Sequence, residues 1–492
     1  MKDFISVNPN EVGISAKSIN RLLDALEESG LPFHSCMILR YGKVALEAYW
    51  APNRQDETHR LYSATKSFVS IAIGLLIDRG QLSLHDKIVK FFPDLVSEAT
   101  HPYVKETTVR DLLRMTTPFS QSTYGDPDIR GKNWLASYFH TQPDHPAGTI
   151  FNYDSCGTYV LGAIVRRITG KYFYEFLREE ILCELEVSKE SRCLLGPDRE
   201  AWAGSALLLS TRDFAKFSQF LLNGGVWNGK RLISEKYLRE ATAKQVNNNP
   251  EGANEPWRCG YGYQFWILRD NAFCMLGAGG QISVCLPDKN LVFVCTADTQ
   301  GRSDSKALIF HRLWTEIIEK LDTETDSDPN IYPNLLARCQ NLTLPSVVGK
   351  SASPLAERIS GVIYRMENNA MGIDKLSLSL AGDEGTFTYQ NARGEKKIRF
   401  GIGKNLLSTF PETHFYGDVL GEPSGREFRT VNSGAWVEDT TFAIRCNIID
   451  NSVGNLTITL AFKGDALALS MHKNAQFFLK DYHGFTGGVK KS

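Results

Sequence analysis

The amino-acid sequence predicts an α+β domain followed by a second domain that consists mostly of β-strands. Between about residues 100 and 250 apolar residues recur with the helical period of about 3.6, and strand-like patterns stand on both sides of this block. After residue 356 the pattern changes to an alternation of apolar and polar residues between turn residues. A sheet assembled from segments at both ends of a helical block is typical of an α+β fold.

The first elements of the chain are a helix, a hairpin and a second helix. Ser15 is a favourable N-cap for an amphipathic helix through INRLLDALEES. SCMILR and KVALEAYW flank the turn signal Tyr41-Gly42-Lys43, which predicts a β-hairpin. The segment LYSATKSFVSIAIGLLIDRG, residues 61–80, is apolar at every third or fourth position and predicts a buried helix that ends with Gly80 as C-cap.

The remainder of the first domain, which spans residues 1–322, alternates between helical and strand patterns. Helical periodicity marks TVRDLLRM, GTYVLGAIVRRITG, FYEFLREEIL and TRDFAKFSQFLL. Strand patterns return in YGYQFWIL, AFCML, QISVCLP and LVFVCTA. The segment SKALIFHRLWTEIIEKL then predicts the helix that closes the domain.

Residues 323–356 are rich in Asp, Pro, Ser and Asn and predict a linker. In residues 357–492 the segments LSLSLAG, TFTYQ, KKIRFGIG, LTITLAFKG and ALALSMH alternate with period two. They predict a C-terminal, mostly-β domain, either a sandwich or a small barrel.

The composition excludes several classes of function. With 55 basic and 56 acidic residues the net charge is -1, and no basic strip predicts a nucleic-acid partner. The N-terminal residues lack the pattern of a signal peptide, and charges interrupt every apolar segment long enough to suggest a membrane span. The ten cysteines lack metal-type spacing and are expected to be mostly buried, reduced thiols. A cytoplasmic protein without membrane contact is expected.

Ser63 and Lys66 form an SxxK pattern at the start of the apolar helix. A serine hydroxyl becomes a good nucleophile when a base removes its proton, and a lysine can do so when burial partly deprotonates it. Residues three apart share a helix face, so the two side chains can touch. An ordinary serine at a helix start is the alternative.

The pattern occurs three times, at Ser63-Lys66, Ser303-Lys306 and Ser470-Lys473. The third copy lies in an alternating strand, where an offset of three points side chains to opposite faces. N-capping of a helix is a sufficient explanation for Ser303. Only the first copy opens a strongly apolar helix.

Two further segments supply chemistry that would complement Ser63. Tyr153 and Ser155 precede another apolar helix, and a buried tyrosine that faces a lysine can shuttle a proton, although a core tyrosine is the alternative. The glycines of LGAGGQISV lead into a strand rather than a helix, so a dinucleotide-binding loop is excluded. Glycines beside a strand instead allow close approach to backbone N–H groups, which can form part of an oxyanion hole.

In this order the segments resemble the serine β-lactamase and penicillin-binding-protein superfamily, in particular its class C-like esterase and amidase branch, over about residues 10–320. The matches are YSATKSF for the SxxK element, Tyr153-Asp154-Ser155 for Tyr-x-Asn/Ser, and Met275-Leu276-Gly277 where Lys-Thr-Gly or His-x-Gly is usual. The GAGGQ pattern is similar to that of proteins like 6-aminohexanoate-dimer hydrolase.

The resemblance implies a β-lactamase/transpeptidase-like fold, with an antiparallel sheet flanked by helices, an inserted helical region and a site between them. It implies that Ser63 is the nucleophile, Lys66 its proton partner and Tyr153 the general base and acid. The implied oxyanion hole consists of the N–H groups of Ser63 and Ala278. Water would hydrolyse the acyl-enzyme, with no metal or cofactor.

The departures from the family pattern bear on the substrate. Met275 and Leu276 supply no cation for a substrate carboxylate. The resemblance implies that Ser155 and Gly277 bind the substrate, and the side chain of Ser155 is shorter than that of the usual asparagine. Both changes favour a small ester or a linear amide over penicillin. The alternatives are a D-amino-acid peptidase or weak β-lactamase, and a catalytically silent binding or scaffold protein. Whether the chain forms a homo-oligomer is left open.

Overall fold

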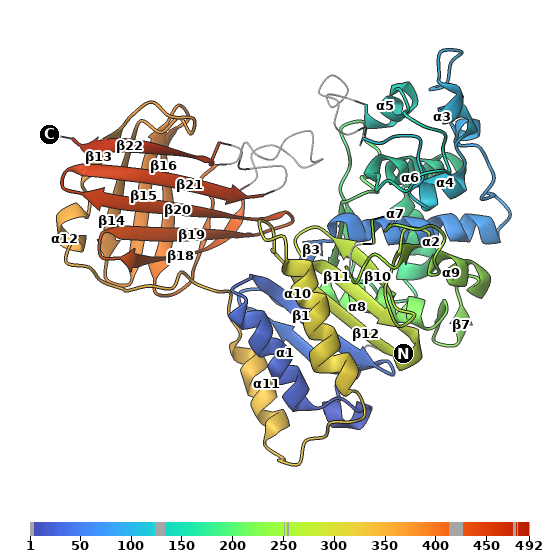
Figure 1. Cartoon of the computed structure of the whole chain (residues 1–492), viewed down its shortest axis with the longest axis horizontal. Helices are drawn as coiled ribbons and strands as arrows, with labels where there is room; N and C mark the ends of the chain where they lie inside the picture. The colour runs from blue at the N-terminus through green and yellow to red at the C-terminus, as the bar shows by residue number, and fades with distance from the viewer. Residues whose placement is uncertain are drawn as a thin grey trace.

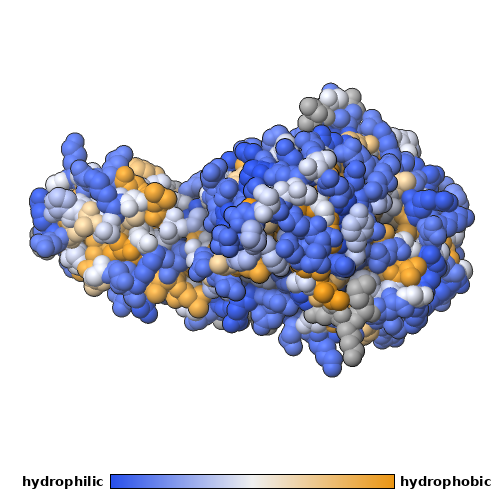
Figure 2. All heavy atoms as spheres, turned by 90° about the horizontal axis from the view of Figure 1, so that it is seen from below, coloured by the Kyte–Doolittle hydropathy of each residue, from blue (hydrophilic) through white to orange (hydrophobic). Residues whose placement is uncertain are grey.

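The computed structural model shows two folded bodies, one of helices and sheet and one built almost entirely of strands (Figure 1). Seen from below, the smaller body meets the larger one at a narrow waist, and polar residues cover most of this face (Figure 2). The structure describes residues 4–121, 123, 133–249, 251–252, 255–412, 427–475, 479 and 481–491.

A seven-stranded antiparallel sheet forms the centre of the larger body, with strand order β2-β1-β12-β11-β10-β9-β8. Its strands are β1 (Phe33–Arg40), β2 (Lys43–Tyr49), β8 (Gly260–Tyr261), β9 (Trp266–Ile267), β10 (Phe273–Gly277), β11 (Gln281–Leu286) and β12 (Leu291–Ala297). Strand β1 pairs with β12, so the first and last strands of the body are neighbours within the sheet. The predicted α+β class and the assembly of the sheet from distant segments are confirmed.

Helices cover both faces of this sheet. On one face lie α1 (Ala16–Glu28), α10 (Ser305–Arg312) and α11 (Ile331–Asn341) (Figure 1). On the other, α8 (Thr211–Leu222) contacts β1, β11 and β12. The alternation of β1 explains the two layers, because Ile38 packs in the core with α1 whereas Met37 packs in the core with α8.

The helical region between the strands is built around α2 (Thr65–Asp78), which contacts α6, α7 and α9. All residues of α2 from Thr65 to Leu76 are buried, which explains why its sequence is apolar on every side. The other helices of the region are α3 (Pro102–Glu106), α4 (Val109–Leu113), α5 (Trp134–His140), α6 (Ser155–Thr169), α7 (Phe173–Leu177) and α9 (Glu235–Ala241). Short strands β3 (Thr58–Arg60), β4 (Arg192–Cys193) and β5 (Leu207–Ser210) form a small sheet, and β6 (Val226–Trp227) pairs with β7 (Lys230–Arg231).

The smaller body is a closed β-barrel, which decides between the predicted sandwich and barrel. Nine strands follow one another around it in the order β16-β15-β14-β13-β22-β21-β20-β19-β18, and β16 closes the ring by pairing with β18. Strand β17 pairs with β18 as an addition. The strands are β13 (Ile363–Met366), β14 (Lys375–Ala381), β15 (Glu384–Asn391), β16 (Gly394–Ile402), β17 (Leu406–Thr409), β18 (Arg429–Glu438), β19 (Thr441–Ile449), β20 (Val453–Lys463), β21 (Ala466–Asn474) and β22 (Gly484–Lys490).

Residues 323–356, predicted as a linker, contain α11, and the short α12 (Ala356–Ile359) begins at the last of them. Helix α11 packs on α1, where Arg338 forms ion pairs with Asp24 and Glu27 and Leu335 is buried. The sequence analysis did not predict this helix, because its composition is polar and only one face of α11 carries apolar residues. Thr343 also bridges to Ala51 of the larger body. The division of the chain at residues 322 and 356 stays a prediction.

No disulfide links the ten cysteines, all of which lie in the described part of the chain, and six of them are buried. Within that same part, none of the helices combines the length and the apolar character needed to cross a membrane.

Candidate active site

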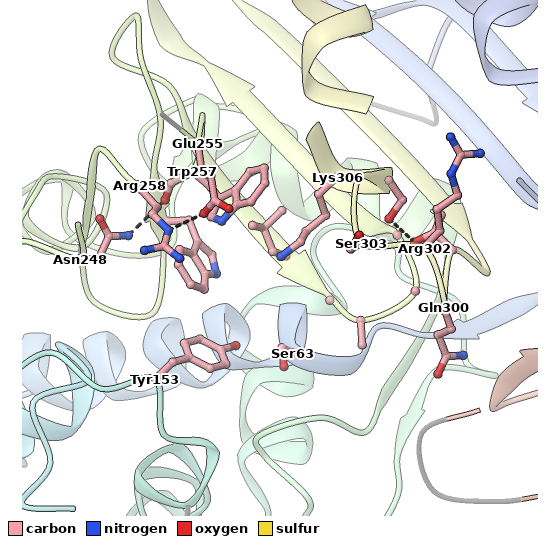
Figure 3. Close-up of a pocket in the computed structure, with 18 of the residues that line it drawn as sticks. Ser63, Tyr153, Asn248, Glu255, Trp257, Arg258, Gln300, Arg302, Ser303 and Lys306 are labelled. Carbon is pink, nitrogen blue, oxygen red and sulfur yellow. Dashed lines mark hydrogen bonds and ion pairs between the residues drawn. The ribbon is translucent and has the colours of Figure 1, made fainter. Parts of the chain in front are cut away.

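A cavity of about 990 Å³ opens where the β10–β11 end of the sheet meets the inserted helical region. Three groups among the residues that line it carry the chemistry discussed below (Figure 3). Ser63 and Tyr153 lie on the side of the helical region, Leu276 to Gly280 form the strand edge, and residues 299–303 with Lys306 form the opposite wall. Two of the residues predicted from the sequence, Ser63 and Tyr153, therefore share one cavity with the glycine turn that holds Gly277 and Ala278.

Ser63 lies in a single 3₁₀ turn, Tyr62–Ala64, that leads directly into α2. The Lys66 Nζ lies 2.9 Å from the Ser63 Oγ and also donates to the Gly204 carbonyl oxygen at 2.6 Å. These two contacts fix the amine beside the hydroxyl. The structure thus brings the SxxK pair into direct contact.

Lys66 is buried, with an exposed fraction of 1%. This burial lowers the pKa of Lys66 to about 7, and the nearby Asp154 carboxyl opposes the shift. A lysine with that pKa is partly neutral at neutral pH and can accept a proton. The apolar surroundings of α2 therefore give Lys66 the property that a general base needs.

Tyr153 lies just before α6, and its side chain points toward Ser63 (Figure 3). Burial raises the pKa of Tyr153, whereas a hydrogen bond with the Ser63 side chain lowers it. The Lys66 Nζ lies 4.9 Å from the centroid of the Tyr153 ring, which is stacked on Trp266. Ser63, Lys66 and Tyr153 form one connected cluster, in which a proton can pass from the serine to either partner.

The glycine turn after β10 lies against the segment that precedes Ser63 and lines the same cavity. A side chain at Gly277 would place its Cβ about 2.0 Å from the Leu61 carbonyl oxygen, so only glycine allows this strand to pack on the segment before Ser63. Gly279 and Gly280 have positive φ angles of 75° and 88°, which the tight turn requires. The glycines thus permit contact between two chain segments, whereas the sequence suggested close approach of a substrate.

Ser155 is the first residue of α6 and is not among the residues that line the cavity. Its neighbour Asp154 is buried and caps α6 by accepting from the N–H groups of Cys156 and Gly157. Asn152, before Tyr153, does line the cavity. A direct contact between Ser155 and a substrate remains a prediction, and Asn152 is better placed for it.

The other copies of the sequence patterns, which are the SxxK copies and two Tyr-x-Asn sequences that begin at Tyr332 and Tyr389, lie in different settings. Ser470 and Lys473 lie on β21 of the barrel, while Tyr332 lies on α11 and Tyr389 on β15. The interpretation of Ser303 as the N-cap of a helix is wrong, because the N-cap residue of α10 is Asp304.

Sequence reasoning missed a cationic wall of the cavity. Lys306 points into the cavity from α10, and its Nζ lies 4.6 Å from the Trp257 ring centroid (Figure 3). Burial lowers the pKa of Lys306, and the Glu255 carboxyl opposes this shift. Glu255 itself forms an ion pair with Arg258. Within the described residues Lys306 has no ion pair or hydrogen bond, so its ammonium is available to a ligand. The SxxK pattern at 303–306 was the only sequence signal for this position.

The fold and the Ser-Lys-Tyr cluster define the class of protein as one of serine-hydrolase type. A model of the family described as Beta-lactamase matches residues 19–313, more than half of the chain. The chain therefore belongs to the Beta-lactamase family, a hydrolase superfamily, as the sequence motifs predicted.

Individual relatives agree with this assignment. The 6-aminohexanoate-dimer hydrolase of Paenarthrobacter ureafaciens is 24% identical over 223 residues, which is 42% of this chain and 56% of that protein. A penicillin-binding-protein homologue from Caulobacter crescentus has a similar fold, with a TM-score of 0.51 at 17% identity over 62% of this chain and 99% of that one. A Bacillus anthracis protein provisionally described as a 6-aminohexanoate-dimer hydrolase has a TM-score of 0.52 at 21% identity over 59% of this chain and 80% of that one. The structural likenesses confirm the predicted β-lactamase-like fold.

Proposed function

We propose that this protein is a serine hydrolase that cleaves a small ester or a linear amide through an acyl-enzyme on Ser63. The observation that carries the proposal is the contact of the Ser63 hydroxyl with Lys66, whose pKa burial lowers to about 7. A serine next to a partly neutral amine, in a cavity large enough for a small molecule, has the requirements of a nucleophile.

The reaction begins when the Ser63 Oγ attacks the carbonyl carbon of the substrate and its proton passes to the neutral Lys66 amine. The N–H groups of Ser63 and Ala278 stabilise the oxyanion of the tetrahedral intermediate. Tyr153 then donates its proton to the leaving alcohol or amine as the carbon–oxygen or carbon–nitrogen bond breaks, and Lys66 returns a proton to Tyr153. A water molecule attacks the ester on Ser63 by the reverse sequence and releases the acid.

The walls of the cavity favour a substrate with an apolar chain. Leu276 presents an uncharged side chain at the strand edge, and Phe151, Trp257 and Trp266 add aromatic surface. The relative from Paenarthrobacter ureafaciens is named for a linear amide substrate, and this supports the amide class. We further propose a cytoplasmic location, no nucleic-acid or membrane partner and no cofactor.

A D-amino-acid peptidase or weak β-lactamase is a second candidate, because Lys306 supplies the cation that Met275 and Leu276 lack. Peptides and penicillins carry a free carboxylate that such an ammonium can bind. The third candidate, a silent scaffold, finds less support because the Ser63, Lys66 and Tyr153 side chains are in mutual contact.

Replacing Lys306 with alanine is expected to raise KM about tenfold for substrates that carry a free carboxylate, since a hydrogen bond to a charged group contributes about 1.5–3 kcal/mol. KM for the uncharged methyl ester of the same compound should change little. Lys306→Arg is the matched control and should keep the preference for the carboxylate. Equal KM changes for both substrates would show that Lys306 does not recognise the charge.

Replacing Tyr153 with phenylalanine is expected to lower kcat at least about 10²-fold, the usual scale for a proton-transfer group. The ring that stacks on Trp266 is retained, so the change removes only the hydroxyl. The comparison of kcat on an amide and on an activated p-nitrophenyl ester checks the role. The amide should suffer more, because its leaving group needs the proton. Wild-type kcat on the amide would remove Tyr153 from the mechanism.

The function itself is tested by incubating the full-length protein with a fluorophosphonate, p-nitrophenyl esters, a linear amide and a penicillin. The expected results are an adduct of one fluorophosphonate in the intact mass, mapped to Ser63, and turnover of esters or amides with slow or absent penicillin turnover. No adduct and no turnover would contradict the enzyme proposal. Rapid penicillin turnover would replace it by the β-lactamase alternative.

A further inference from the structure

The β19–β20 turn of the barrel, defined here as residues 450–452 together with Val453 at the start of β20, reaches the larger body beside the candidate active site. Figure 1 shows the ends of barrel strands close to the part of the larger body that holds β3. Ser452 and Val453 in this turn are buried, with exposed fractions of 2% each. The barrel therefore forms a closed contact with the region that precedes Ser63.

Tyr62, the residue before Ser63, is the main contact of this turn. The Val453 N–H donates to the Tyr62 hydroxyl at 3.1 Å, and the hydroxyl lies 3.4 Å from the Val453 carbonyl oxygen, to which it donates. Arg60 stacks over the Tyr62 ring at 4.6 Å and also donates to the Ser452 hydroxyl at 3.4 Å. The Tyr62 side chain is thus held at its tip and on its face.

The backbone of Tyr62 has a φ angle of 47°, in the left-handed region that a bulky residue rarely adopts. Such a conformation costs about 1–3 kcal/mol and persists only where the surroundings impose it. The peptide that joins Tyr62 to Ser63 carries the Ser63 N–H, so the Tyr62 conformation sets the direction of this proposed oxyanion-hole donor. The contacts with Val453 and Arg60 hold that conformation.

The same turn also contacts the other side of the site. The Gln300 amide, on the cavity wall, donates to the Val453 carbonyl oxygen at 2.8 Å. A Cβ at Gly279 would lie 3.6 Å from Val453 Cγ2, so the valine packs against the turn that holds Ala278. The Thr299 N–H, one residue before Gln300, donates to the Gly279 carbonyl oxygen at 3.0 Å. One residue of the barrel therefore touches the supports of both proposed oxyanion donors.

A buried polar contact anchors the turn at its base. The Asn455 amide of β20 donates to the Asp298 carboxylate at 2.8 Å, and the Asn474 amide of β21 donates to the Asn455 carbonyl oxygen at 3.1 Å. Asp298 also accepts from the Gln300 amide at 3.0 Å. The chain of bonds runs from the barrel wall to the cavity wall, so the turn has a fixed position relative to the cavity.

We infer that the β19–β20 turn of the barrel is a positioning element of the active site. Through its contacts with Tyr62 and Gln300 it holds the Ser63 and Ala278 N–H groups in the relative positions that an oxyanion hole requires. The inference rests on the proposed function. Because the turn contacts the supports of the oxyanion donors rather than the substrate, its loss lowers the rate of the chemical step and leaves substrate binding in place.

The test is Tyr62→Phe in the full-length protein, which removes the hydroxyl and keeps the ring under Arg60. The expected result is a kcat at least about tenfold lower with KM within about twofold, because small misplacements of reacting groups cost about one to two orders of magnitude. The inhibition constant of an arylboronic acid, which forms a tetrahedral adduct on Ser63 and fills the oxyanion hole, should rise by a similar factor.

Tyr237→Phe is the matched control. Its hydroxyl is also buried and donates to a backbone carbonyl oxygen, that of Ser70, at 2.8 Å, but it lies on α9 away from the barrel. This variant should lose stability in thermal unfolding while keeping kcat and the boronic acid affinity. A kcat loss in Tyr237→Phe equal to that in Tyr62→Phe would assign the effect to general destabilisation and overturn the inference.

Gln300→Leu provides a second route if Tyr62→Phe does not fold, because Gln300 is partly exposed on the cavity wall. It should lower kcat at least about threefold, with the boronic acid inhibition constant changed in parallel. If Tyr62→Phe keeps the wild-type kcat and boronic acid affinity, the inference is overturned but the proposed function is not. The same result in Gln300→Leu has the same meaning where that variant replaces Tyr62→Phe. A wild-type protein without adduct or turnover would instead overturn the proposed function.

Discussion

Replacing Ser63 with alanine is expected to abolish the fluorophosphonate adduct and to lower kcat at least about 10⁴-fold, the scale seen when a catalytic serine is removed. The alanine keeps the 3₁₀ turn and leaves Lys66 bonded to the Gly204 carbonyl oxygen, so the fold should persist. Intact mass and ester turnover measured on the same sample check both expectations.

Ser303→Ala is the informative control for this experiment, because Ser303 belongs to a second SxxK copy and lines the same cavity. The variant should still form the adduct. An adduct that survives in Ser63→Ala and disappears in Ser303→Ala would move the nucleophile to the other wall of the cavity. Either result separates a pattern that occurs by chance from one that performs the reaction.

The sequence predicted those elements of the fold that depend on interactions between residues close together in the chain. Local patterns were sufficient for the hairpin of β1 and β2 and for α2, since the turn residues and the apolar period lie within one segment. Helix α11 was missed because its stability comes from α1, through Arg338 and Leu335, which the local composition does not reveal.

The candidate site divides in the same way. Ser63 and Lys66 are neighbours along one turn, so their contact could be predicted from spacing. Lys306 and the barrel turn at Val453 come from segments more than 200 residues away, and only the folded chain brings them to the cavity. The sequence around Ser63 contains no pattern that predicts which distant loop contacts the start of α2.

The long-range contacts also change the interpretation of substrate recognition. The absence of a cation at Met275 and Leu276 suggested that a substrate carboxylate would find no partner. Lys306 faces the same cavity from α10, so the cation is present on a different element. The missing cation at Met275 and Leu276 therefore no longer argues by itself against a carboxylate-bearing substrate, while the aromatic wall still favours a substrate with an apolar chain.

Replacing Lys66 with alanine is expected to lower kcat about 10³-fold, within the usual range for a general base. The wild-type kcat/KM should rise with pH and level off above about 7, because burial lowers the pKa of Lys66 to about 7 and only the neutral amine accepts the Ser63 proton. In Lys66→Ala this rise near pH 7 should disappear. A pH–rate profile from pH 5 to 9 on one ester checks both effects.

Lys66→Arg is the matched control, because arginine keeps the positive charge and stays protonated at every pH of the profile. It should be as inactive as Lys66→Ala, since a fixed charge cannot accept a proton. A wild-type rate in Lys66→Arg would assign Lys66 an electrostatic role, and a retained rise near pH 7 in Lys66→Ala would assign the base to another group.

The same pKa shift links Lys66 to stability. In the unfolded chain the lysine titrates near its ordinary value of 10.5, whereas in the folded protein it titrates near 7. Between these values the unfolded chain binds more protons, so the contribution of Lys66 to the free energy of unfolding rises with pH from about 7 to 10.5 and is least favourable below 7. Lys66→Ala should therefore show a smaller increase in unfolding free energy over this window than wild type, as measured by denaturant unfolding at pH 7 and pH 9.5. Equal increases would mean that Lys66 titrates normally in the folded protein and cannot serve as the base.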